Sequence, residues 1–238
     1  MSVLSSIGIV LLAIIIMGSF QLVPGVFALF YHYTSGRFSR DKASTLSLFY
    51  IIGAEIMSAF LFIASFYISY LLFLQDLNPC NTILTWIYIG IFATLSVISL
   101  LFYYRHPHSR DTELFLPRSF AKNLRLRAQK VKTPSDAFAL GALSNVYELF
   151  FTLPLYLLTA TEIIYMHTEY IVDNLLTLLY IITTVIPLFV IYYSFQFNHN
   201  LAHIQKTRIK DKTFHRIIIS VSYLTIALLL LCFRIIKL

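Results

Sequence analysis

Charged side chains and cysteine are both scarce in this chain of 238 residues. Lys, Arg, Asp and Glu make up 12% of the sequence, whereas a soluble domain contains about 25%. Apolar residues make up 58%, more than the roughly 45–50% of a soluble domain. Cys80 and Cys232 are too few for a disulfide framework or a zinc site and leave open only a single bridge. The composition excludes an ordinary soluble domain and indicates a membrane protein.

Basic residues are absent from two connections between the apolar segments and are concentrated in three others. The basic connections are 31–46, 105–136 and 196–216, and those without Lys or Arg are 75–82 and 161–173. Lys and Arg near the ends of membrane helices are retained on the cytoplasmic side. The alternation therefore predicts that the basic connections are cytoplasmic and that the N-terminus lies outside. Arg234 and Lys237, at the C-terminal end, are the exceptions.

Six apolar segments are long enough to cross a bilayer, which takes about 20 helical residues. They lie at about 3–30, 47–74, 83–104, 137–160, 174–195 and 217–236. We expect an all-α integral membrane protein with six transmembrane helices, forming one polytopic domain over residues 1–238 in a bacterial-type plasma membrane. No basic residue precedes the first segment, so it does not resemble a cleaved signal peptide. Trp86 and Tyr88, at the outer end of the third, are expected to anchor it at the interface.

The cytoplasmic basic loop 105–136 contains an amphipathic stretch between Pro117 and Pro134. Its apolar residues recur at helical spacing, with Lys and Arg between them: Phe120, Leu124, Ala128 and Val131. The pattern predicts a helix in the plane of the membrane interface, where basic side chains attract anionic lipid. A solvated, disordered linker is the alternative. Because the net charge of +7 arises largely from these loops, we do not expect a nucleic-acid partner.

The same loop divides the predicted spans into two groups of three with opposite topology. A 3+3 inverted repeat of this kind is common in transporters, whose sites lie near mid-membrane on interrupted helices. The leading span of each half contains proline, at Pro24-Gly25 in the first and at Pro154 in the fourth. Proline removes a backbone donor and frees a carbonyl that can line a polar cavity. A simple kink explains the same sequence equally well.

Carboxylates are nearly absent from the predicted spans, which contain only Glu55 and Glu148. A charge at the bilayer centre costs about 2.5–3.5 kcal/mol on insertion scales, so such residues are functional candidates. Glu148 lies about 16 Å into the fourth span, at 1.5 Å per residue, close to the midplane. On helical spacing it shares a face with Gly141, Ser144, Asn145 and Thr152. Glu55 in turn shares a face with Ser58, Ser65 and Ser69, and the two polar stripes are expected to face each other across a pathway.

A carboxyl group in a low-dielectric site can alternate between protonated and ionised forms as its surroundings open and close. We therefore expect Glu148 to carry a coupling proton or cation, with Ser144 and Asn145 orienting it. Glu55 is a second, shallower candidate for the same role. The opposing interpretation is a protonated glutamate that only holds neighbouring helices together by a hydrogen bond.

His199 and His203 are the basis of a different hypothesis, because their i, i+4 spacing would place both on one helix face as metal ligands. Membrane di-iron enzymes need larger histidine clusters, so interfacial polar residues are the simpler interpretation. The sequence has no phosphate-binding glycine loop and no cysteine pair for a thiol relay. We expect no cofactor and no enzymatic activity. A metalloenzyme and a non-catalytic scaffold or accessory subunit remain the alternatives.

Three features carry a resemblance to a known family. The first span ends in Gln21-Leu-Val-Pro24-Gly25, a short basic loop 36–40 follows, and a long basic loop follows the third span. Together they resemble the lysine-exporter (LysE) type superfamily, which includes cadmium-resistance-like proteins and the GAP (Sap) group. The resemblance implies a small six-helix secondary transporter that exports a small polar or ionic solute, with Pro24, Gly25 and Asn145 in its pathway. The chain has Val26 and Val146 where those exporters often have proline, so an amino-acid substrate does not follow.

Overall fold

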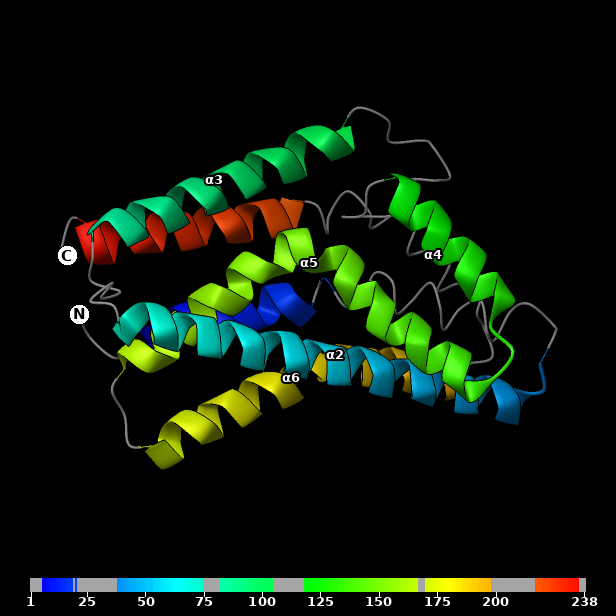
Figure 1. The fold of residues 1–238 in the computed structure, drawn as a ribbon. Helices are drawn as coiled ribbons and strands as arrows, with labels where there is room; N and C mark the ends of the chain where they lie inside the picture. The colour runs from blue at the N-terminus through cyan, green and yellow to red at the C-terminus, as the bar shows by residue number, and fades with distance from the viewer. Residues whose placement is uncertain are drawn as a thin grey trace.

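The structure of the chain is a computed structural model built from helices (Figure 1). It describes residues 6–18, 20, 38–74, 82–104, 118–166, 170–197 and 217–235. Within these ranges there is no β-strand, and short non-helical stretches lie only at helix ends. The predicted all-α fold is thus confirmed for the part of the chain that is described.

The helices fall into three kinds. The long apolar helices are α2 (Arg40–Leu74), α3 (Thr82–Tyr104), α5 (Pro134–Tyr165) and α6 (Tyr170–Phe197). These four are long and apolar enough to cross a membrane, so the chain is an α-helical integral membrane protein. Two shorter apolar helices are Ser6–Gly18 and Ile217–Phe233, and a π-helical turn at Leu231–Ile235 ends the second. The remaining helix, α4 (Arg118–Lys130), is polar and basic.

Three of the long helices extend several residues further than the apolar segments that predicted them. α2 begins at Arg40 instead of residue 47, α5 runs from Pro134 to Tyr165 instead of 137–160, and α6 runs from Tyr170 to Phe197 instead of 174–195. A capping box starts α5, in which Thr133 Oγ1 accepts from the Asp136 amide (3.2 Å) and Asp136 Oδ2 accepts from the Thr133 amide (3.0 Å). Hydropathy marks where a helix lies in lipid, whereas capping residues mark where it begins.

α2 and α5 lie side by side and run in the same direction (Figure 1). They approach each other closely through glycine. A Cβ atom at Gly53 would overlap the backbone carbonyl of Phe138, and one at Gly141 would overlap the carbonyl of Tyr50 and lie 2.9 Å from the amide nitrogen of Ala54. Small residues allow membrane helices to pack backbone against backbone, and here no larger residue fits without moving a helix.

Two other neighbouring pairs run in opposite directions. α3 and the helix Ile217–Phe233 are joined by a reciprocal serine pair, in which Ser96 Oγ donates to the Ser220 carbonyl (2.9 Å) and Ser220 Oγ donates to the Ser96 carbonyl (3.0 Å). The start of α2 meets the end of α6, where the Ser44 and Tyr192 hydroxyls lie 2.6 Å apart. These directions are those of a chain that passes back and forth through one layer.

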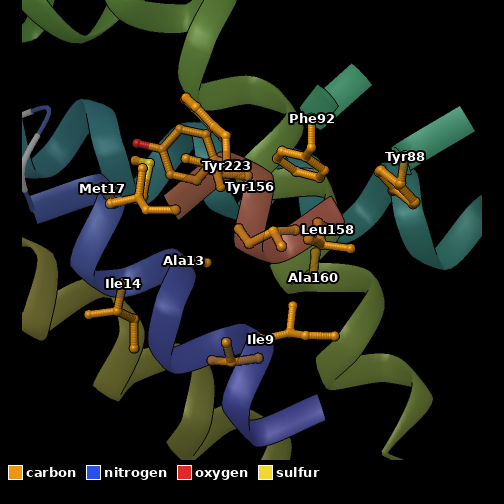
Figure 2. Packing of buried hydrophobic residues seen from close by; sticks show 14 of the residues in the cluster. Ile9, Ala13, Ile14, Met17, Tyr88, Phe92, Tyr156, Leu158, Ala160 and Tyr223 are labelled. Carbon is orange, nitrogen blue, oxygen red and sulfur yellow. The ribbon is translucent and has the colours of Figure 1, made fainter. Parts of the chain in front are cut away.

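Aromatic and aliphatic side chains from several helices fill the core around α5 (Figure 2). Met17 comes from the helix Ser6–Gly18, Phe92 from α3, Tyr156 from α5 and Tyr223 from the helix Ile217–Phe233. The rings of Phe92 and Tyr223 are stacked with centroids 5.9 Å apart. α5 is therefore the central helix, and its buried face meets most of the other elements.

The helix α4 confirms the amphipathic stretch, and the disordered alternative does not hold for residues 118–130. Its position differs from the expectation. Leu124, Ala128 and Val131 are buried in a cluster with apolar residues of α2, α5 and α6. The apolar face of α4 thus packs on the helix bundle instead of lying in lipid, while Arg127 and Lys130 stay exposed.

Candidate functional site

Glu148 lies on a polar face of α5 that is buried along most of its length. Its side chain is 1% exposed, and within the described residues its Oε1 atom has no hydrogen-bond partner. The predicted members of this face are all buried: Gly141, Ser144, Asn145 and Thr152. Helical spacing alone brings them together, since residues three and four apart are neighbours on one side of a helix.

Ser144 and Asn145 join α5 to α2. The Asn145 side-chain amide donates to the backbone carbonyl of Ala54 (2.6 Å), and the Tyr50 hydroxyl donates to Ser144 Oγ (3.1 Å). Ser144 Oγ donates in turn to the Gly141 carbonyl (2.6 Å). The donors of both residues are therefore directed at helix backbone, next to the glycine crossing, and not at Glu148.

Glu55 approaches the same region from α2. Its side chain is half-buried, and its Oε2 atom is buried without a hydrogen-bond partner in the described residues. One turn further, the Ser58 hydroxyl lies 2.9 Å from the hydroxyl of Tyr156 on α5. The side chains of Glu55 and Glu148 both lie near the Tyr156 hydroxyl. The two stripes do face each other, and hydrogen bonds from Asn145 to Ala54 and between Ser58 and Tyr156 join them.

A second group of hydroxyls lies near the other end of α5. Thr161 Oγ1 donates to the Leu157 carbonyl (2.7 Å) and lies 3.3 Å from Ser69 Oγ on α2. The Tyr88 hydroxyl of α3 lies 3.2 Å from the same Thr161 oxygen. Tyr88 is therefore buried in the bundle, and its expected role as an interface anchor is wrong, whereas Trp86 is half exposed.

Glu162 is a buried carboxyl that the sequence analysis missed. Its side chain is 0% exposed, because α5 continues past residue 160 and carries Glu162 into the bundle. The span prediction ended at the last apolar run and left this residue in an outer connection. The signal was present in the spacing, since Thr152, Thr159 and Glu162 continue the face of Glu148 at intervals of three to seven residues.

Pro154 interrupts α5 between the two carboxyls, as expected. It cannot donate to the carbonyl of Phe150, and the next carbonyl, of Phe151, accepts a hydrogen bond from the Tyr223 hydroxyl (3.0 Å). A neighbouring helix thus stabilises the broken turn, as membrane proteins require.

Several predicted residues lie outside the described part of the chain. These are Pro24, Gly25, His199, His203 and Cys80. Cys232 is described and is a free thiol. In the described ranges no three His, Cys, Asp or Glu side chains come close enough to hold a metal ion.

These features define a class: a helical membrane protein with carboxyl groups buried in a polar seam between parallel helices. The chain matches no family model, no curated protein and no solved structure.

Proposed function

We propose that this protein is a small secondary transporter that exports a small polar or ionic solute, with a proton or cation bound at Glu148 as the coupling species. The observation that carries the proposal is the Oε1 atom of Glu148, which is buried in an apolar span and has no hydrogen-bond partner among the residues that the structure describes. Intramembrane carboxyls that pair with nothing are expensive, and they commonly mark ion pathways.

Glu148 differs from two other buried polar groups on the seam, the side chains of Asn145 and Tyr156, because these are hydrogen-bonded to α2. Asn145 and Tyr156 each make a hydrogen bond of 2.6–2.9 Å across to α2, as groups that hold helices together do. An unsatisfied buried acceptor costs about 1–3 kcal/mol, so its presence calls for a compensating use. Binding a proton or a cation during the transport cycle is such a use.

A 3+3 inverted repeat of six spans, with the N-terminus outside a plasma membrane, forms part of the proposal. Two contacts support it. The reciprocal Ser96–Ser220 pair is what a twofold relation between α3 and the last helix would produce. The close contact of α2 with Gly141 also has a counterpart, since a Cβ atom at Gly18 would lie 3.0 Å from the ring of Pro187 on α6.

The exposed basic residues of α4 complete the proposed arrangement. Arg127 and Lys130 lie on the side of α4 that faces away from the bundle. Basic side chains at a cytoplasmic surface attract anionic lipid, at about 1 kcal/mol each. We propose that Arg127 and Lys130 bind anionic lipid at the membrane surface.

The test is flux through the purified full chain in vesicles. A pH gradient should drive solute-dependent proton movement, reported by a dye inside the vesicle, at rates well above protein-free vesicles. The probes are mixed protein amino acids and, separately, Na⁺, K⁺ and Cd²⁺. Flux that stays at the protein-free baseline with every probe would contradict transport and favour the scaffold alternative.

The proposed topology predicts a labelling pattern. After Cys80 and Cys232 are replaced by serine, a membrane-impermeant maleimide should label Asn78→Cys in intact cells. It should label Arg127→Cys only after the cells are permeabilised, because the proposed topology puts the basic loop 105–136 on the cytoplasmic side. The reverse pattern would invert every connection and remove the assignment of the N-terminus to the outside.

A further inference from the structure

Glu162 lies on the same face of α5 as Glu148, close to the end of the helix. The two carboxyls are about 21 Å apart along the axis, at 1.5 Å per residue. Glu162 is only three residues before Tyr165, the last residue of α5, yet it is 0% exposed. The group is thus buried, although it lies within one turn of the end of the helix. Nothing in the transporter proposal so far uses it.

Hydroxyl groups occupy the face between the two carboxyls. Tyr156 and Thr159 come from α5, and Tyr180 comes from α6, and all three are at most 1% exposed. The rings of Tyr156 and Tyr180 meet edge to face with centroids 6.4 Å apart. This contact brings the α6 tyrosine onto the polar face of α5.

The Thr159 and Tyr180 side chains are neighbours whose hydroxyls interact by a weak hydrogen bond. In the described residues, neither Thr159 Oγ1 nor Tyr180 Oη makes a hydrogen bond of full geometry. Buried polar groups of this kind are usually satisfied by internal water, which needs two to four polar neighbours. Thr159 is also three residues before Glu162, so the two side chains are neighbours on the helix.

We propose that Glu162 is a second proton-binding residue and that Thr159, Tyr180 and Tyr156, with intervening water, form a proton path from it to Glu148. The inference rests on the proposed coupling role of Glu148. Hydroxyls and water suit a relay because each can accept one hydrogen bond while donating another.

The proton balance is simple. The carboxylic acid of Glu162 releases a proton, each hydroxyl or water oxygen accepts one proton and passes on its own, and the carboxylate of Glu148 accepts the last. Glu162 is then reprotonated from water beyond the end of α5. Every hydroxyl is regenerated, and no electron is transferred.

Three further titratable groups border the path from the packed helices. Glu55 of α2 interacts electrostatically with Tyr156, at the end of the path near Glu148. Tyr88 of α3 contacts Thr161, next to Glu162. Tyr223 of the helix Ile217–Phe233 donates to the Phe151 carbonyl. The hydroxyls of Tyr88 and Tyr223 contact partners that do not belong to the proposed proton path. Glu55 is therefore the competing proton source for Glu148.

The test follows the protonation of Glu148 in the full chain, in vesicles of neutral lipid. External pH is lowered rapidly, and the infrared carbonyl band of protonated carboxyls is recorded, with the Glu148 band identified by its loss in Glu148→Gln. We expect the band to appear about tenfold or more slowly in Tyr180→Phe, Thr159→Val and Glu162→Gln, with unchanged final amplitude. Molecules inserted in the opposite orientation should contribute a phase that these variants leave unchanged.

The variants have matched controls. Tyr180→Phe keeps the ring that stacks on Phe62 with centroids 4.3 Å apart, so the fold is retained. Tyr67→Phe and Thr94→Val make the same changes at exposed positions on α2 and α3 and should leave the rate unaltered. A wild-type rate in all three path variants would overturn the path and leave the coupling role of Glu148 standing. Absence of a pH-dependent Glu148 band in the wild type would overturn both.

Discussion

Replacing Gly141 with alanine should destabilise the folded bundle by about 1–3 kcal/mol, the usual cost of overpacking a filled core. The added Cβ would overlap the backbone carbonyl of Tyr50 and lie 2.9 Å from the Ala54 amide nitrogen, so a flexible side chain cannot simply move aside. α2 and α5 must separate, which also weakens the Asn145–Ala54 hydrogen bond. Unfolding of the purified protein in detergent, followed by circular dichroism, measures the loss, and Gly141→Leu should lose more.

Gly90→Ala is the matched control, because a Cβ atom at Gly90 on α3 meets nothing within 4 Å. There the substitution should be neutral or stabilising, by up to about 1 kcal/mol, since alanine favours helix. If Gly141→Ala and Gly90→Ala unfold alike, the close crossing of α2 and α5 is not what stabilises the bundle.

Glu148→Gln should abolish pH-driven transport in vesicles while leaving the protein folded. Glutamine fills nearly the same volume, but it cannot exchange a proton or neutralise a bound cation. A purely structural glutamate would give the opposite result, with normal flux and a change in unfolding free energy of about one hydrogen bond, ~0.5–1.5 kcal/mol. Initial rates of proton and solute flux, measured beside the stability of the same preparation, separate the two cases.

Glu55→Gln is the internal comparison for that experiment. Glu55 is half-buried, whereas Glu148 is 1% exposed, so the change at Glu55 should reduce transport less. Normal transport by Glu148→Gln throughout the physiological pH range would remove its coupling role. The scaffold alternative would then explain the chain better.

Apolar length and helical spacing were enough to predict the four long apolar helices and the polar face of α5. The buried face of α5 around Glu148 follows directly from the periodicity of its polar residues. Helix ends were less predictable, because an apolar run marks the part of a helix that lies in lipid and not the residues at which the helix begins and ends. The continuation of α5 to Tyr165, which buries Glu162, depends on packing against other helices and not on hydropathy.

Contacts between helices could not be predicted from sequence patterns. Nothing local distinguishes Gly141, whose absent side chain makes room for α2, from Gly90, which faces open space. The sequence likewise indicated that α4 has an apolar face but not that the bundle would cover it. Tyr88 looked like an interface anchor because its partner, Thr161, lies far away in the chain.

The pairing of distant helices has a consequence for how the protein is made. α2 acquires its main partner, α5, only after α3 and α4 have been synthesised, and Ser96 meets Ser220 only when the last helix emerges. Until then the nascent chain must hold Ser58 and Ser69 in lipid without their partners on α5. Assembly of the bundle is therefore a late event, because a chain that ends before residue 134 lacks the partner of α2 and one that ends before residue 217 lacks the partner of Ser96.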